Sequence, residues 1–297
     1  MLACGRVQDN GVPAATLPPP AAAITAVPSP TPAPTAQVPR PTLSVAGGSP
    51  SAPAPPAARP TATPALTPTP HPLAPYTIEG LRQRAYPGGE IQVVVQQEEN
   101  ESYRRYFIVY PSDGLAISGS MTIPRGQGPF PVVILLHGYF DRDQYYTGAD
   151  TWQTADFLAR NGYITIAPDY RSWGSSDSGQ SFFHTGLVAD ALNLISAVPS
   201  LPQADAQRIG LLGHSKGGYL GARGAGYEHR LNCAVLIAPF FDRKPFDKLS
   251  TFLQAGYQHI SGSANKDEAR EFVEQFTLAD IAGNIQCPIL IIHGGKD

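Results

Sequence analysis

The sequence has few of the groups that bind metals, nucleic acids or membranes. It contains three cysteines in 297 residues, and no His, Cys, Asp or Glu cluster has the spacing of a metal site. Charged residues make up 15% of the chain and give a net charge of −3, so no basic patch predicts nucleic-acid binding. No apolar run reaches 18 residues, which predicts no membrane span. Glycine-rich phosphate loops are also absent, and we therefore expect neither a metal nor a cofactor.

Proline is distributed very unevenly, and this divides the chain. Residues 13–75 hold 20 of the 31 prolines, two arginines and no acidic residue. Such a segment cannot bury enough apolar surface to offset the entropy lost on ordering. We therefore predict a disordered, partly polyproline-II tether over 13–75, followed by one folded domain over 76–297.

Residues 1–12 resemble the end of a bacterial lipoprotein signal. Met1-Leu2-Ala3-Cys4-Gly5 places a cysteine after small and aliphatic residues, without the charged and apolar regions of a complete signal before it. Lipidation of Cys4 would anchor the tether and its domain to a membrane. We expect an extracytoplasmic, surface-anchored protein, and the alternative is a cytoplasmic protein with a disordered tail.

Within the domain, strand patterns alternate with helix patterns. Strands are expected at 91–97, 103–110, 115–123, 131–136, 163–167, 208–212, 233–238 and 288–292, and helices at 151–161, 185–198, from about 217, 246–260 and 266–276. This alternation predicts an α/β fold, with a mostly parallel, doubly wound sheet and helices on both faces. The last two helices fall within 240–285, between two strands, and form the expected lid.

One serine stands where a strand turns sharply into a helix. Gly213-His214-Ser215-Lys216-Gly217 follows an apolar strand, and the glycines on either side of the serine allow the strand and the helix to pack closely. Such a turn strains the serine backbone, raises Oγ above the sheet edge and leaves the next backbone N–H free to bind an oxyanion. The pattern is typical of a catalytic nucleophile.

Three signals occur in a defined order along the chain: His137-Gly138 after an early buried strand, the Ser215 turn, and Gly294-x-x-Asp297 after the last strand. Over residues 105–297 they resemble the prolyl oligopeptidase and acylaminoacyl peptidase branch of the α/β-hydrolase superfamily, and the neighbouring dienelactone-hydrolase-like esterases. The resemblance implies an α/β-hydrolase fold and a serine hydrolase. Its substrate would be a small molecule or peptide, cleaved at an amide or carboxylic ester bond through an acyl-enzyme.

The resemblance also implies roles for individual residues. Ser215 is the nucleophile, and Asp297 is the acid that orients the catalytic histidine. Asp242 is the rival acid, because some of these hydrolases carry the acid after an earlier strand. The backbone N–H groups of Tyr139 and Lys216 form the oxyanion hole.

The histidine base is missing from the expected position. On this fold the order is serine, acid and then histidine, and Asp297 is the last residue of the sequence. We expect the intact protein to continue with a catalytic histidine, and we expect the present chain to be catalytically incompetent. A substitute base from the lid, His259, is the alternative.

Two positions depart from the peptidase pattern. Tyr139-Phe140 follows His137-Gly138 where the peptidases have a second glycine and a proline, and Lys216 stands where many of them have an aromatic residue. Residues 76–105 are also too few for a β-propeller that would filter substrates by size. A carboxylesterase therefore stays open beside a peptidase, and a non-catalytic surface binding protein is the second alternative.

Other polar residues are given structural roles. Cys233 and Cys287 open two strands that are neighbours in this fold, so a disulfide is a candidate in an exported protein, and two buried thiols are the alternative. Asp169 and Arg171 are expected to brace the loop after the strand at 163–167. His137, at the end of a buried strand, is expected to contact loop backbone.

Overall fold

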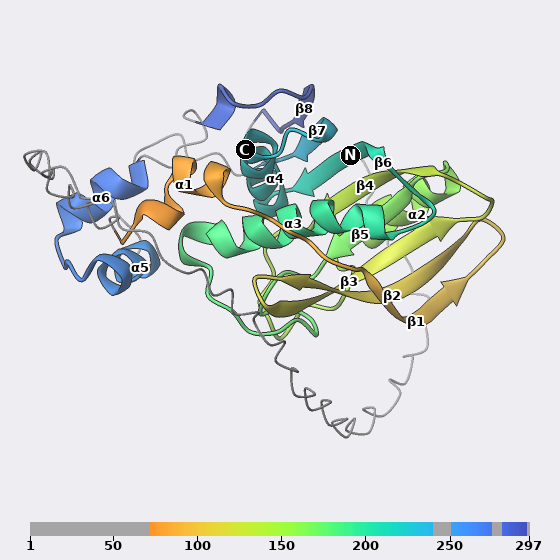
Figure 1. Cartoon of the computed structure of the whole chain (residues 1–297), viewed down its shortest axis with the longest axis horizontal. Coiled ribbons are helices and arrows are strands. Elements are labelled where there is room, and N and C mark those ends of the chain that lie inside the picture. The colour runs from red at the N-terminus through yellow and green to blue at the C-terminus, as the bar shows by residue number, and fades with distance from the viewer. Residues whose placement is uncertain (1–71, 240–250, 275–280, 296–297) are drawn as a thin grey trace, which may run out of the picture. The chain divides into compact units, whose positions relative to one another are not determined.

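The computed structural model describes residues 72–239, 251–274 and 281–295 (Figure 1), all within one compact unit, Leu66–Asp297. The lipidation candidate Cys4, the tether up to residue 71 and both candidate acids, Asp242 and Asp297, lie outside the described residues.

One sheet of eight strands forms the centre of the described part, in the order β1-β2-β3-β5-β4-β6-β7-β8. The strands are β1 Gln92–Glu99, β2 Tyr103–Ser112, β3 Leu115–Pro124, β4 Phe130–Leu136, β5 Ile164–Pro168, β6 Ala204–His214, β7 Leu231–Ile237 and β8 Ile289–Ile292. The β1–β2, β2–β3 and β3–β5 pairs are antiparallel, and the strands from β5 through β8 are parallel. The predicted mostly parallel sheet is therefore confirmed.

Helices cover both faces of this sheet. They are α1 Ile78–Gln83, α2 Trp152–Arg160, α3 Thr185–Ala197, α4 Lys216–Tyr227, α5 Thr251–Ser261 and α6 Lys266–Glu274, with 3-10 turns η1 Ala74–Tyr76, η2 Phe182–His184 and η3 Val198–Ser200. Ala155 of α2 packs with Leu135, whereas α3 and α4 pack with Ile134 and Leu136. Because successive strand residues point to opposite faces, α2 lies on one face and α3 and α4 lie on the other.

Helix α3 supplies the centre of the larger core. Leu187, Leu192 and Ile195 are each at most 1% exposed, and they pack against the strands and α4. The helical stretch Phe182–Ser200 is long and apolar enough to cross a membrane, and 78% of it is buried inside the fold. This is weak evidence for a span, since a buried core helix has the same length and composition.

Helices α5 and α6 pack on each other in a second, smaller cluster. Its buried members are Leu73, Phe183, Leu253, Tyr257, Ala269, Phe272 and Val273. Leu73 is only 2% exposed and leads into η1, so the end of the proline-rich segment packs against this cluster. Burial of this one apolar side chain stabilises the contact.

The two strand cysteines do not behave as either alternative predicted. Cys233 is an exposed free thiol and Cys287 is a half-buried one, so no disulfide joins them. β7 and β8 are neighbours as expected. A Cβ on Gly210 of β6 would lie 3.3 Å from the Sγ atom of Cys233, so this sulfur lies against β6. Neither a disulfide nor a pair of fully buried thiols is therefore found at these two positions.

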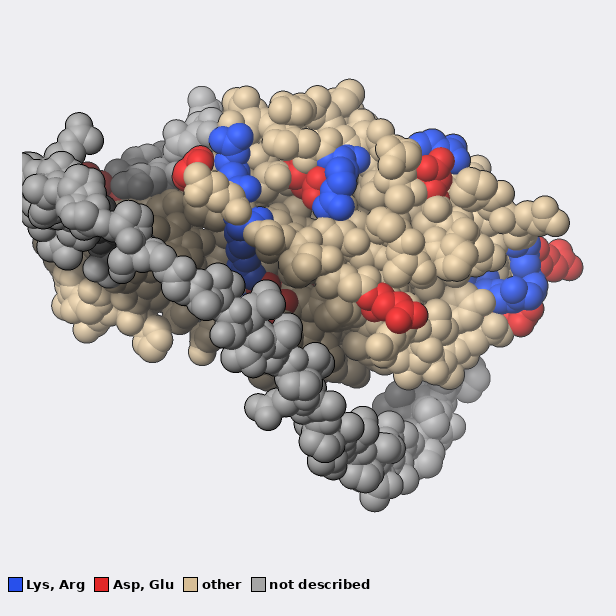
Figure 2. Space-filling model, viewed as in Figure 1, with Lys and Arg blue, Asp and Glu red and all other residues tan. Residues whose placement is uncertain are grey.

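The surface carries few charges. Figure 2 shows a face on which the blue and red side chains are sparse and mostly lie next to one another. Ion pairs with largely exposed side chains, such as Arg208–Asp205 and Arg104–Glu99, occur among the described residues. Such pairs contribute little to stability, because solvent screens them. The buried clusters on the two faces of the sheet therefore carry the fold.

Candidate active site

Ser215 lies at the sharp turn between β6 and α4, at the carboxyl end of the parallel strands. Its backbone has φ 52° and ψ −115°, a region that residues other than glycine rarely adopt. The Ser215 N–H donates to the carbonyl oxygen of Ile237 on β7 at 2.9 Å, and its carbonyl accepts from the N–H of Tyr219 at 3.1 Å. These bonds hold the strained turn in place.

The two glycines of the turn are required by close backbone contacts. A Cβ on Gly217 would lie 2.0 Å from the carbonyl oxygen of Leu136, at the end of β4. A Cβ on Gly213 would lie 2.3 Å from the carbonyl oxygen of Gly217. The strand, the helix and β4 can approach this closely only because both positions lack a side chain.

Replacing Gly217 by alanine is expected to destabilise the protein by about 3 kcal/mol, because the obstacle is backbone that cannot rotate away. Gly224→Ala in the same helix is the matched control, since the added Cβ would meet only the Leu192 side chain, at 3.9 Å. That variant should be neutral or slightly more stable. Urea denaturation compares the two, and equal midpoints would contradict the close packing of the turn.

The turn after β4 lies against the same serine. A Cβ on Gly138 would lie 3.5 Å from the Cβ atom of Ser215. The N–H of Gly138 itself is occupied, because it donates to Oδ2 of Asp150 at 2.8 Å. Among the described residues, the backbone N–H groups of Tyr139 and Lys216 donate to no protein acceptor. Tyr139 follows Gly138, and Lys216 follows Ser215. Because Gly138 and Ser215 lie against each other, the two amides expected at the oxyanion hole come from neighbouring turns.

Asp150, which belongs to none of the sequence motifs, joins these two turns. Its Oδ2 atom accepts from Gly138 and lies 2.8 Å from Nδ1 of His214, inside the serine turn. His214 is therefore held by a carboxylate rather than directed at the serine. Asp150 lies 64 residues before His214, so no local sequence pattern links the two residues. In the structure its backbone has a positive φ of 67°, which few residues other than glycine adopt.

His137 is a structural residue, as expected. Its ring stacks on Tyr145 with centroids 4.5 Å apart, and its two nitrogens lie 2.7 Å and 3.3 Å from the carbonyl oxygens of Gly138 and Asp169. Burial lowers the pKa of His137 to about 4, against the opposing effect of those carbonyls. The imidazole is therefore neutral near pH 7.

This shift makes the fold sensitive to acid. In the unfolded chain His137 takes up its proton near pH 6.5, whereas the buried ring does so only near pH 4. Its stabilising contribution is therefore complete above pH 6.5 and falls by about 3 kcal/mol as the pH drops toward 4. We expect His137→Gln to cost more unfolding free energy at about pH 7 than at about pH 4.5. The exposed His229→Gln is the control, and a cost that does not change with pH would refute the assignment.

The other described histidines also make contacts away from the serine. His293 lies with its ring nitrogens 3.3 Å from the carbonyl oxygens of Pro239 and Gly294, and His259 stacks on Phe182 with centroids 5.3 Å apart. Across residues 72–239, 251–274 and 281–295, no histidine hydrogen-bonds to Oγ of Ser215. His259, the alternative base from the sequence, packs against an aromatic ring.

A pocket of about 840 Å³ lies beside the serine turn. Its lining comes from three loop segments, 139–143, 171–173 and 179–182, with His184, Leu187 and Lys216. The lining thus includes both expected oxyanion-hole residues. Helix α5, within the segment expected to form a lid, contacts this wall, because His259 stacks on Phe182.

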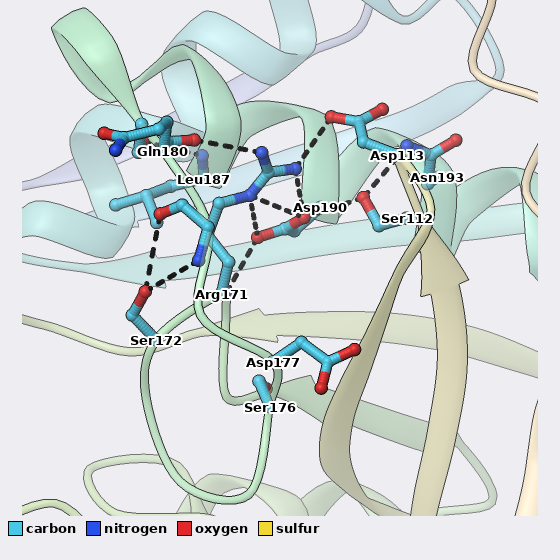
Figure 3. A network of polar contacts seen from close by, with 12 residues as sticks. Ser112, Asp113, Arg171, Ser172, Ser176, Asp177, Gln180, Leu187, Asp190 and Asn193 are labelled. Atoms are coloured by element: carbon cyan, nitrogen blue, oxygen red, sulfur yellow. Dashed lines mark hydrogen bonds and ion pairs between the residues drawn. The ribbon is translucent and has the colours of Figure 1, made fainter.

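A buried ion pair fixes one wall of the pocket (Figure 3). Arg171 Nη2 lies 2.7 Å from Oδ1 of Asp190 and 2.8 Å from Oδ2 of Asp113, and its Nη1 donates to the carbonyl oxygen of Gln180. Asp190 is fully buried and also accepts a 2.7 Å hydrogen bond from Ser112. These contacts tie the loop at 171–180 to α3 and to the end of β2, as expected for Arg171.

Asp169 braces the same loop from the other side. Its carboxylate accepts hydrogen bonds from the hydroxyls of Ser118, Tyr145 and Thr147 at 2.6 to 2.8 Å. Burial raises the pKa of Asp169, although the three hydroxyl donors oppose this effect. The residue makes structural contacts and faces no open part of the pocket lining.

Comparisons with known proteins agree with this geometry. The sequence matches the model of the prolyl oligopeptidase family over residues 149–297, half of the chain. It is 28% identical over 190 residues to 2,6-dihydropseudooxynicotine hydrolase of Paenarthrobacter nicotinovorans, an alignment that covers 62% of this chain and 49% of that protein. It is 25% identical over 210 residues to esterase EstD of Thermotoga maritima, covering 61% and 50%. The chain therefore spans about half the length of these two relatives.

Solved structures share the fold. Acetyl xylan esterase 1 of Thermoanaerobacterium sp. JW/SL YS485 superposes with a TM-score of 0.58 at 18% identity, covering 72% of this chain and 77% of that one. The acetyl xylan esterase of Paenibacillus sp. R4 gives 0.56 at 22% identity, covering 74% and 78%. With the strand order, the strained serine turn and the family match together, the chain belongs to the prolyl oligopeptidase family and has an α/β-hydrolase fold.

Proposed function

We propose that the protein is a serine hydrolase that transfers the acyl group of a carboxylic ester or amide to Oγ of Ser215 and then to water. The observation that carries the proposal is the backbone of Ser215, at φ 52° and ψ −115°. Strain of this kind persists only where the surrounding structure enforces it, and it clusters at catalytic sites. A serine in an ordinary loop has no need of it.

The proposed reaction begins with attack of Oγ on the carbonyl carbon. The Oγ proton passes to a histidine base, and Asp297 or its rival Asp242 is the acid that orients this histidine. The backbone N–H groups of Tyr139 and Lys216 stabilise the resulting oxyanion. Each such donor contributes about 3 to 4 kcal/mol to the lowering of the barrier. Collapse expels the protonated alcohol or amine, and water then releases the acid from Ser215.

Two relatives support hydrolysis as the reaction class, since one is named as a hydrolase and the other as an esterase. The family match supports a peptidase equally. The two possibilities differ in the leaving group, which is an alcohol for an ester and an amine for an amide. A paired assay of an aminoacyl amide and a short acyl ester carrying the same acyl group measures the preference directly.

The proposal is tested by covalent labelling. A fluorophosphonate probe should label the full-length protein at Ser215, and Ser215→Ala should abolish the label. Absence of labelling would favour the alternative of a non-catalytic binding protein. Labelling that survives Ser215→Ala would place the nucleophile elsewhere.

A further inference from the structure

Two positive side chains share one aromatic ring at the wall of the pocket. Nζ of Lys216 lies 4.7 Å from the centroid of the Trp173 ring, and the guanidinium carbon of Arg142 lies 5.0 Å from it. Lys216 also lies 5.5 Å from the centroid of the Tyr139 ring. The Trp173 indole is fixed, because its N–H donates to the carbonyl oxygen of Phe140 at 3.1 Å. The aromatic rings therefore hold two like charges near each other.

No carboxylate of the described residues neutralises this pair. Neither Lys216 nor Arg142 makes an ion pair within that part of the chain. Asp141 lines the pocket but accepts a hydrogen bond from the Tyr139 hydroxyl at 2.9 Å, and Asp143 also lines it. The third cation of the lining, Arg171, differs because it is already paired with two carboxylates.

The arrangement weakens the folded state of the free protein. Burial, together with the smaller effect of the Arg142 charge, lowers the pKa of Lys216 to about 8. A partly desolvated ammonium without an anionic partner is costly, whereas a charge-assisted hydrogen bond to a carboxylate would offset the lost hydration. Lys216 follows the proposed nucleophile Ser215 directly in the chain, so an anion bound by its side chain would lie near the reacting carbonyl group.

We propose that Lys216 and Arg142 bind a carboxylate of the substrate in this pocket, so that the enzyme selects esters or amides carrying a carboxylate close to the scissile carbonyl. This rests on the proposed role of Ser215 in hydrolysis. Lys216 then has two roles. Its backbone N–H stabilises the oxyanion, and its side chain binds a carboxylate on the acyl or leaving group.

The binding step is tested without catalysis. In the full-length Ser215→Ala protein, calorimetric titration compares monomethyl glutarate, which has one ester and one carboxylate, with neutral dimethyl glutarate. We expect the monoanion to bind about tenfold more tightly or better. Lys216→Met should abolish this preference and Arg142→Gln should reduce it. Arg208→Gln is the control, because it removes an equal charge from an exposed residue that does not line the pocket.

The pH dependence gives a second readout on the unaltered pocket. Arg142, Asp141 and Asp143 line the same pocket as Lys216. His137 and His184 stay neutral between about pH 7 and pH 9, because burial lowers both pKa values to about 4. The preference for the monoanion should therefore fall as the pH rises through about 8, where the Lys216 ammonium loses its proton. This readout keeps the proposal testable if Lys216→Met does not fold.

Equal binding of the two esters, including no measurable binding of either, would overturn the proposal. A preference that survives Lys216→Met, or that does not change with pH, would overturn it as well. These outcomes are separate from the fate of the proposed hydrolysis. Failure of fluorophosphonate labelling would refute the role of Ser215 while leaving the carboxylate preference measurable.

Discussion

Ser215→Ala is expected to lower kcat by about a million-fold, because a nucleophile and its base act as one unit and loss of either removes the covalent route. The KM of the same substrate should change little, since the pocket lining does not include the Ser215 side chain. Steady-state kinetics on the full-length protein, with whichever ester or amide it cleaves best, measure both constants.

The matched control for this variant is Ser178→Ala, a serine in an exposed part of the loop after β5. It should keep the activity of the unaltered protein. Thermal unfolding of both variants separates a catalytic loss from a folding defect. If Ser215→Ala folds and retains more than a trace of activity, the acyl-enzyme route is wrong.

Asp190→Ala is expected to lower the free energy of unfolding by about 3 to 5 kcal/mol, because it leaves the Arg171 guanidinium buried without its main partner. The Arg171 side chain is 7% exposed and that of Asp190 is fully buried, so water cannot take the place of the lost contact. Urea denaturation gives the difference, and the exposed Arg104→Ala should change it little.

A double variant sharpens this prediction. Arg171→Met with Asp190→Leu removes both charges and fills a similar volume, so it should recover much of the stability lost in Asp190→Ala. Recovery would show that the isolated charge, rather than the missing side chain, causes the loss. An Asp190→Ala variant as stable as the unaltered protein would refute the role of the ion pair as a brace.

The sequence predicted those features that short-range patterns determine. The apolar runs at 131–136 and 288–292 predicted strands, and the structure has β4 and β8 there. The glycine spacing around Ser215 predicted a strained turn, because close packing of a strand and a helix excludes side chains at those positions.

Features that depend on long-range packing were not predictable in the same way. The contact of Asp150 with His214 forms between segments far apart in the chain and belonging to no shared motif. The direction of the Cys233 sulfur depends on the space left by Gly210 on the adjacent strand. The stacking of Arg142 and Lys216 on Trp173 likewise needs the three-dimensional course of two loops.

The Asp150 carboxylate connects the turn after β4 with the serine turn. Because one carboxylate oxygen contacts both the Gly138 amide and the His214 ring, it links the turn that precedes the Tyr139 amide to the turn that carries the nucleophile. The alignment on which the proposed chemistry depends therefore includes a side chain from a third segment, outside both turns.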